Sequence, residues 1–219
     1  MLNDFLRVGV LCSKRAPGLS ELMHHPFRGR MFEVDCVISS DSSFGECGAP
    51  VITHPIHSFY DHHGAPVRDM TIRALYDRFT AEMFRSVGVN VVVLLGYLYV
   101  VTDPLLKGFP DHVINVHDGP AKYPGLHATR DAITAGERAT WSIVHHVNET
   151  LDGGPVIACS EPFPVAPFAY EAAVAGQQDI VRAYSFAHRE WMMRSSWGGL
   201  VVRALEYLAV GASLEAGVA

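Results

Sequence analysis

The chain has 219 residues, of which 49% are hydrophobic and 18% charged, a balance typical of folded globular proteins and not of disordered ones. The net charge of −6 argues against a nucleic-acid partner, and no apolar run approaches the roughly 20 residues that a membrane-spanning helix needs. The N-terminus lacks the features of a signal peptide and the four cysteines form no C-x-x-C pair, so we expect a cytoplasmic protein with reduced thiols.

The N-terminal part of the sequence predicts a strand, a loop and a helix. An apolar strand over residues 7–12 leads into a loop of mostly small residues, 13–18, and a helical pattern begins at Leu19. Because a helix N-terminus attracts anions, and because Lys14 and Arg15 lie in this loop, it is either an anion site or an ordinary connection. Two more strands are predicted before residue 54, over residues 32–40 and 50–53.

A histidine-rich stretch follows these strands and contains His54, His57, His62 and His63. The H-x-x-H spacing could suit a metal ion, but Pro55 and the loop-like context offer no helix to turn two imidazoles to one face. We predict a solvated loop without metal, and contact with a substrate as the alternative. The next stretch, residues 66–87, repeats apolar side chains at helical spacing and is predicted to be a core-packing helix.

Three further apolar strands lead into polar or glycine-rich residues. One, over residues 91–95, ends at Gly96. The next runs over residues 111–117 and exits through Asn115 and His117, and the third, over 141–148, precedes Asp152-Gly153-Gly154-Pro155. Because α/β enzymes carry their chemistry at the carboxyl ends of their strands, we expect the Asn, the His and the Asp to meet at one sheet edge.

The remaining elements complete an α/β pattern. A helix is predicted from about residue 126 to 135, a strand over 156–159, and helix from Tyr170 onward, interrupted at Gly198-Gly199. Within this last region Ile180 and Trp191 are among the expected buried positions. We predict one domain over residues 1–219, with a mostly parallel, twisted sheet of about six or seven strands flanked by helices.

The candidate catalytic residues suit acyl transfer. The G-x-S-x-G, G-x-G-x-x-G and P-loop motifs are absent, so a serine nucleophile and a bound nucleotide have no sequence support. Asn115 and a protonated His117 could donate hydrogen bonds to a developing oxyanion, while Asp152 accepts an amine proton, directly or through water, or raises the pKa of the histidine. For each residue taken singly, a structural role in a cap or turn is the alternative.

These residues resemble the folate-dependent formyltransferases, and among them the glycinamide ribonucleotide formyltransferases most. The likeness rests on Asn115-Val116-His117, Lys122-Tyr123-Pro124-Gly125-Leu126-His127 and Leu151-Asp152-Gly153-Gly154-Pro155-Val156-Ile157. It implies the Rossmann-like fold of that family and transfer of a formyl group from 10-formyltetrahydrofolate to an amine. It also implies Asn115, His117 and Asp152 as the catalytic residues.

The resemblance also implies where the folate and the acceptor would bind. Leu98, Tyr99, Val100 and Val101 would line a slot for the pterin ring, although these residues could equally be a strand end packed under a helix. The loop from Val147 through Asn148 and Glu149 to Asp152 would hydrogen-bond the pterin edge. The residues expected to contact the acceptor are Lys14, Arg15, Asp118, His145 and Glu190.

The sequence departs from the family pattern mainly where the acceptor would bind. Lys14-Arg15-Ala16-Pro17-Gly18 replaces a Gly-Ser-Asn that holds phosphate in the family, and Pro17 has no N–H to donate. Asp118 adds a carboxylate beside His117, and Tyr99 replaces a basic residue. We therefore expect a small-molecule amine other than glycinamide ribonucleotide as the acceptor.

Two other functions are compatible with the same residues. One is a different one-carbon transfer or deformylation on this scaffold, and the other is folate binding without turnover. Neither a nucleic acid nor a membrane is expected as a partner, and a homodimer is compatible with the sequence.

Overall fold

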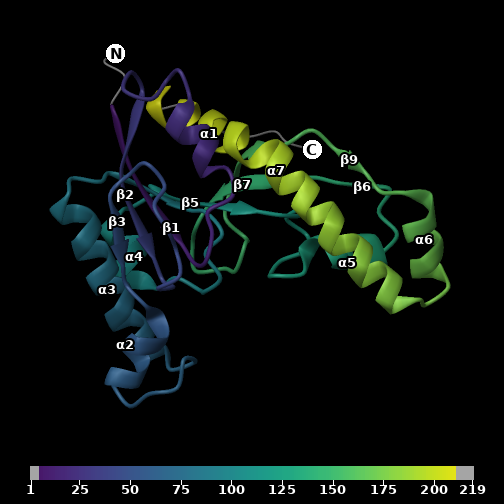
Figure 1. Ribbon diagram of the computed structural model, residues 1–219, viewed down its shortest axis with the longest axis horizontal. Helices are drawn as coiled ribbons and strands as arrows, with labels where there is room; N and C mark the ends of the chain where they lie inside the picture. Colours follow the sequence, from purple (N-terminus) through teal and green to yellow (C-terminus); the bar gives the residue numbers. More distant parts are fainter. Residues whose placement is uncertain (1–4, 211–219) are drawn as a thin grey trace.

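The structure, a computed structural model, describes residues 5–210. Within them, seven strands form one sheet in the order β3-β2-β1-β4-β5-β7-β8 (Figure 1). These strands are β1 (Leu6–Cys12), β2 (Phe32–Ser39), β3 (Val51–Thr53), β4 (Val91–Leu94), β5 (Val113–His117), β7 (Ile143–His146) and β8 (Val156–Cys159). Strands β6 (Ala139–Thr140) and β9 (Phe163–Pro164) form a separate pair. The helices are α1 (Leu19–His24), α2 (Ile56–His62), α3 (Met70–Ser86), α4 (Asp103–Gly108), α5 (Ala128–Thr134), α6 (Pro167–Val174) and α7 (Gln178–Val210).

The sheet is parallel from β3 through β5 and antiparallel at β7 and β8. The central strands read as continuous apolar runs because helices cover both of their faces. This architecture confirms the predicted mostly parallel α/β sheet with flanking helices. The antiparallel turn at β7 was not foreseen, and it decides how the site is assembled.

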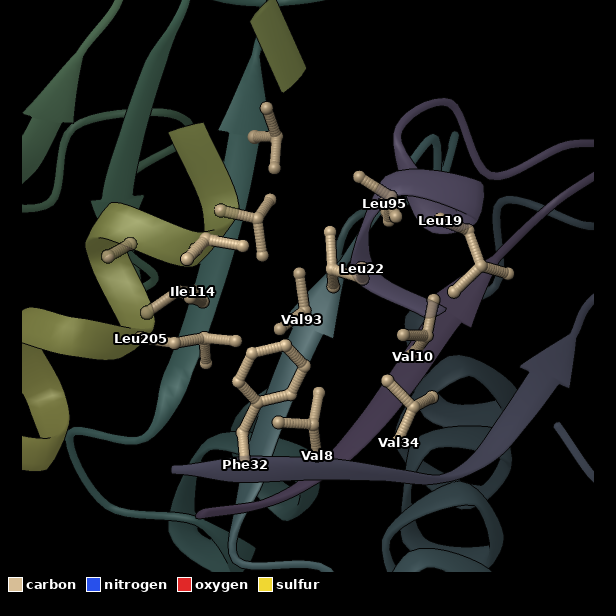
Figure 2. Close-up of a cluster of buried hydrophobic side chains, with 14 of the residues drawn as sticks. Val8, Val10, Leu19, Leu22, Phe32, Val34, Val93, Leu95, Ile114 and Leu205 are labelled. Carbon is tan, nitrogen blue, oxygen red and sulfur yellow. The ribbon is translucent and has the colours of Figure 1, made fainter. Parts of the chain in front are cut away.

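One face of the sheet packs against α1 and α7. Figure 2 shows Val8, Val10 and Val93 of the central strands facing Leu22 of α1 and Leu205 of α7. On the opposite face, other sheet residues pack against α3 and α4, among them Leu11, Ile38 and Val92. Burying an aliphatic side chain of this size contributes about 1.5–3 kcal/mol, so the two layers fix the strands that carry the site.

Helix α7 runs without interruption through Gly198 and Gly199, so the predicted break there is wrong. The reason is packing: Gly198 lies where α7 crosses α1, and a Cβ on it would be 2.4 Å from the Cβ of Glu21. The first half of α7 lies beside α5 and α6 (Figure 1). Ile180 and Trp191 belong to this half of α7. They were expected in the core but are 44% and 47% exposed.

The two adjacent glycines of α7 should respond oppositely to alanine. Gly198→Ala should lower the free energy of unfolding by about 1–3 kcal/mol, because the new methyl group overlaps Glu21. Gly199→Ala should raise it by roughly 0.5–1 kcal/mol, because nothing lies within 4 Å of its Cβ position and alanine favours the helix. Urea denaturation of both variants tests this, and equal effects would contradict the crossing.

The histidine-rich stretch forms helix α2, so its prediction as a loop is wrong. Ile56 and Tyr60 lie four residues apart and are both fully buried in a cluster with Tyr76 of α3. Burial of this i, i+4 pair explains a helix that the histidines and Pro55 obscured in the sequence. The four cysteines are free, and within residues 5–210 no helix is long and apolar enough to span a membrane.

Candidate active site

A cleft of about 290 Å³ lies beside β5 and gathers most of the predicted site residues. Most of its lining comes from three stretches of chain: residues 96–101 after β4, residues 115–118 on and after β5, and residues 147–152 after β7. The other lining residues are Leu94, Gly125, Leu126, His145, and Arg189 and Trp197 of α7. Asn115, His117 and Asp152 all line it, together with every residue expected to bind the folate.

Strand pairing brings the polar side chains together. Asn115 and His117 are two residues apart on β5, so their side chains project from the same face of the sheet. His145 lies directly opposite Asn115 because β7 is antiparallel to β5. Asp152 follows β7, and its φ of 50° belongs to a turn that leads the chain back across the site.

The expected meeting of three strand ends at one edge is therefore wrong for Asp152. Because β7 runs against β5, its carboxyl end lies toward the opposite edge from that of β5. The loop over residues 147–155 folds back instead, and the His146 N–H donates to the Pro155 carbonyl at 2.9 Å to close it. The aspartate reaches the pair on β5 through this closed loop.

The carboxylate of Asp152 is the centre of the site. Its Oδ1 accepts a hydrogen bond from Asn115 Nδ2 at 3.2 Å, and its Oδ2 accepts one from the Gly125 N–H at 2.7 Å. The Nδ1 of His117 lies 3.5 Å from Oδ2, and the Nε2 of His145 lies 3.6 Å from Oδ1. Two imidazoles, an amide and a backbone N–H thus surround one buried carboxylate.

These neighbours keep Asp152 ionised. Burial raises the pKa of its carboxyl group, but the adjacent imidazoles of His145 and His117 and the hydrogen bond from the Gly125 N–H outweigh burial and lower the pKa to about 2. At neutral pH the site therefore holds a fixed negative charge.

The imidazole of His117 is buried and favours its neutral form. Burial lowers its pKa, and the nearby charge of Asp152 and the hydrogen bond to the Tyr123 carbonyl only partly oppose this effect. Nε2 lies 2.9 Å from that carbonyl oxygen and so carries the proton, which leaves Nδ1 as the acceptor beside Asp152. Asp152 raises the pKa of His117 as expected, but burial outweighs it, so the expected protonated form is not the one that this geometry favours.

Asn115 is oriented by a second histidine. The Nδ1 of His145 donates to the His146 carbonyl at 2.8 Å, which leaves Nε2 free to accept from Asn115 Nδ2 at 3.2 Å. Asn115 thereby points its amide hydrogens toward His145 and Asp152. His145, which was expected to contact the acceptor, lies against the side-chain amide of Asn115 and lines the cleft.

The apolar wall of the cleft is the segment over residues 96–101, which is irregular and not a strand end. Leu98 and Val100 expose about half of their surface, 50% and 53%, along this wall. The Leu98 N–H donates to Ser13 Oγ at 3.2 Å, and Thr102 donates its N–H and hydroxyl to the buried Asp77 at 2.6 and 2.7 Å. Hydrogen bonds to Ser13, directly after β1, and to Asp77 of α3 therefore hold this segment in place.

Tyr99 of this wall is held from the side. The guanidinium of Arg73, itself only 3% exposed, lies 4.8 Å from the Tyr99 ring centroid, and the Tyr99 hydroxyl lies 3.1 Å from His57 Nε2. A buried cation over an aromatic face stabilises the ring's position. The histidine-rich helix α2 thus supports the wall, although His57 itself does not line the cleft.

The residues expected to contact the acceptor divide into two groups. Asp118 lines the cleft, is buried and forms an ion pair with Arg189. Arg15 and Glu190 form a bidentate ion pair with each other, and neither they nor Lys14 are among the residues that line the cleft. Within residues 5–210, no group of three or more His, Cys, Asp or Glu has the geometry to hold a metal.

Sequence reasoning missed three contributors to the site: Arg189, Trp197 and the backbone N–H of Gly125. Arg189 is adjacent to Glu190, which was considered, but helical spacing does not show which of two neighbouring polar residues faces a cleft. The Gly125 N–H carries no side-chain signal, although its Lys-Tyr-Pro-Gly motif did mark the loop.

Residues 6–174 match the family described as formyl transferase. The chain belongs to this family. It is 34% identical over 88 residues to phosphoribosylglycinamide formyltransferase of Bacillus subtilis, over 39% of this chain and 45% of that enzyme. It is 27% identical over 153 residues to formyltetrahydrofolate deformylase 1, mitochondrial, of Arabidopsis thaliana, over 69% of this chain and 45% of that protein. The chain thus spans less than half the length of these curated relatives.

Solved structures agree on the fold of this family member. Glycinamide ribonucleotide transformylase 1 from Symbiobacterium toebii superposes with a TM-score of 0.70 at 24% identity, over 97% of this chain and 92% of that one. Phosphoribosylglycinamide formyltransferase from Brucella melitensis gives a TM-score of 0.65 at 18% identity, over 97% of this chain and 100% of that one. These likenesses confirm the Rossmann-like formyltransferase fold.

Proposed function

We propose that this protein transfers a formyl group from 10-formyltetrahydrofolate to the amine of a small molecule other than glycinamide ribonucleotide. The main observation is that Asn115, His117 and Asp152 meet in the cleft. Asn115 Nδ2 lies 3.2 Å and His117 Nδ1 lies 3.5 Å from the Asp152 carboxylate. Membership of the formyl transferase family supports the reaction class.

The cleft suits a flat ring with polar edges. Leu98 and Val100 offer an apolar wall, and the loop over residues 147–152 offers backbone and side-chain polar groups across from it. We assign these two segments to the pterin of the folate, which when bound would supply the activated formyl group. The catalytic residues, Asp118 and Arg189 line the same cleft, and we assign the part lined by Asp118 and Arg189 to the acceptor.

Each catalytic side chain then has a distinct task. On substrate binding, the Asn115 amide exchanges its hydrogen bond to His145 for one to the formyl oxygen, where negative charge develops. The neutral His117, with Nδ1 as its acceptor, takes the proton that the attacking amine loses and gives it to the folate nitrogen as the bond between that nitrogen and the formyl carbon breaks. The fixed charge of Asp152 stabilises the imidazolium that results, at a distance of 3.5 Å.

Deformylation is the second candidate, with water in place of the amine. It is favoured by one observation: the similarity to the Arabidopsis formyltetrahydrofolate deformylase covers 69% of this chain, against 39% for the B. subtilis enzyme. The same proton acceptor and amide donor would serve an attacking water.

Incubating the protein with 10-formyltetrahydrofolate, with and without a panel of amines, separates these reactions. Formyl transfer should give tetrahydrofolate and a formylated amine, detected by mass spectrometry, only when a suitable amine is present. Equal release of formate without any amine would show deformylation instead. Absence of tetrahydrofolate under both conditions, with folate still bound, would leave a binding protein without turnover.

A further inference from the structure

Arg189 lines the cleft and Arg15 lies next to it, outside the lining, and a carboxylate of this chain pairs with each of them. Arg189 pairs with Asp118, whose side chain is only 5% exposed. Arg15 pairs with Glu190 through both guanidinium nitrogens, one at 2.9 Å, and the Glu190 side chain is 17% exposed. Both pairs are charge-assisted, and that of Arg15 is bidentate, so each guanidinium already has a carboxylate partner that a substrate anion would have to displace.

In the loop before α1, which the sequence left as either an anion site or an ordinary connection, two backbone N–H groups are already used within the protein. Helix α1 has only six residues, Leu19–His24. The Ser13 N–H donates to the Gly96 carbonyl and the Leu19 N–H to the Ala16 carbonyl, while Pro17 has no N–H. Gly18, the N-cap, packs so closely on α7 that a Cβ would lie 2.6 Å from the Gly198 nitrogen. The helix start is therefore packed against protein.

The charges that line the cleft also disfavour a substrate with a phosphate group. Leaving histidines aside, the charged lining residues of the described chain are Asp118, Glu149, Asp152 and Arg189, three carboxylates and one guanidinium. A concave site with this balance attracts an amine in its ammonium form and repels a dianion.

We infer that the acceptor is an amine with an uncharged or cationic body and without a phosphate group, because Asp118 neutralises the arginine that lines the cleft and Glu190 neutralises the arginine next to it. This inference rests on the proposed formyl transfer and specifies its substrate. It makes Glu190 a residue that excludes anions by holding Arg15, in place of a residue that contacts the amine.

Phosphate binding tests the inference without any turnover. Thermal unfolding of the wild type should show no saturable stabilisation by inorganic phosphate beyond that by chloride at equal ionic strength. Glu190→Gln frees Arg15 and should show saturable stabilisation, and Asp118→Asn should do the same through Arg189. Glu82→Gln, the same change at an exposed position on α3, should behave as the wild type.

A comparison of two acceptors, one with and one without a phosphate group, gives a second test. Ethanolamine and phosphoethanolamine differ only in the phosphate, and wild-type kcat/KM should be at least about tenfold lower for the phosphate ester, a ratio that Glu190→Gln should reduce. Saturable phosphate binding by the wild type, or its preference for the ester, would overturn the inference. So would a Glu190→Gln variant and an Asp118→Asn variant that both fail to gain phosphate binding. If neither amine is formylated by any variant, the phosphate titration alone decides the charge selection, and formyl transfer itself is decided separately by the panel of amines.

Discussion

Asp152→Asn should lower the turnover of 10-formyltetrahydrofolate by about 10²-fold or more while leaving the fold intact. The amide has the size of the carboxylate and keeps an oxygen to accept the Gly125 N–H, now 2.7 Å away. It loses the charge that stabilises the His117 imidazolium from 3.5 Å. Tetrahydrofolate release under saturating substrate measures the effect, and circular dichroism checks the fold.

A control and a titration make this prediction specific. Asp103→Asn, at a carboxylate that is 53% exposed and pairs with Lys107 on α4, should leave turnover unchanged. The pKa of His117, followed by NMR, should fall further in Asp152→Asn, because the carboxylate raises that pKa against the effect of burial. Unchanged turnover, or a pKa that rises, would remove the role given to Asp152.

Gly154→Ala should disable the loop that carries Asp152. A Cβ at this position would lie 1.8 Å from the His146 carbonyl oxygen and 2.8 Å from its carbon, so backbone must move to admit it. The strand and loop are joined there by the His146–Pro155 hydrogen bond, which the movement would break. We expect a loss of about 1–3 kcal/mol in the free energy of unfolding, together with a large loss of turnover.

The neighbouring glycine provides a matched control. A Cβ on Gly153 would lie 2.6 Å from Thr150 Cγ2, a methyl group that side-chain rotation can move away. Gly153→Ala should therefore cost less stability and keep more activity than Gly154→Ala. Denaturation curves and turnover of the two variants decide the matter, and identical losses would show that the clash with the His146 carbonyl is not limiting.

Local sequence was enough to predict the strands of the main sheet and the placement of two of the three candidate catalytic residues. Apolar runs bounded by glycine, proline and polar residues located β1, β2, β4 and β5 because strands buried on both faces have few polar positions. Asn115 and His117 follow from the same signal, since residues two apart on one strand share a face. The motifs around them identified the family, which residues 6–174 confirm.

The tertiary structure alone decided how Asp152 reaches this pair and which charges are available to a substrate. The aspartate depends on an antiparallel β7 and a loop that folds back, and no local pattern encodes strand direction. The pairing of Arg15 with Glu190 joins residues 175 positions apart in the chain. A basic loop therefore looks like an anion site until the fold brings the opposing carboxylate beside it, because charge pairing depends on distance in space and not on spacing in sequence.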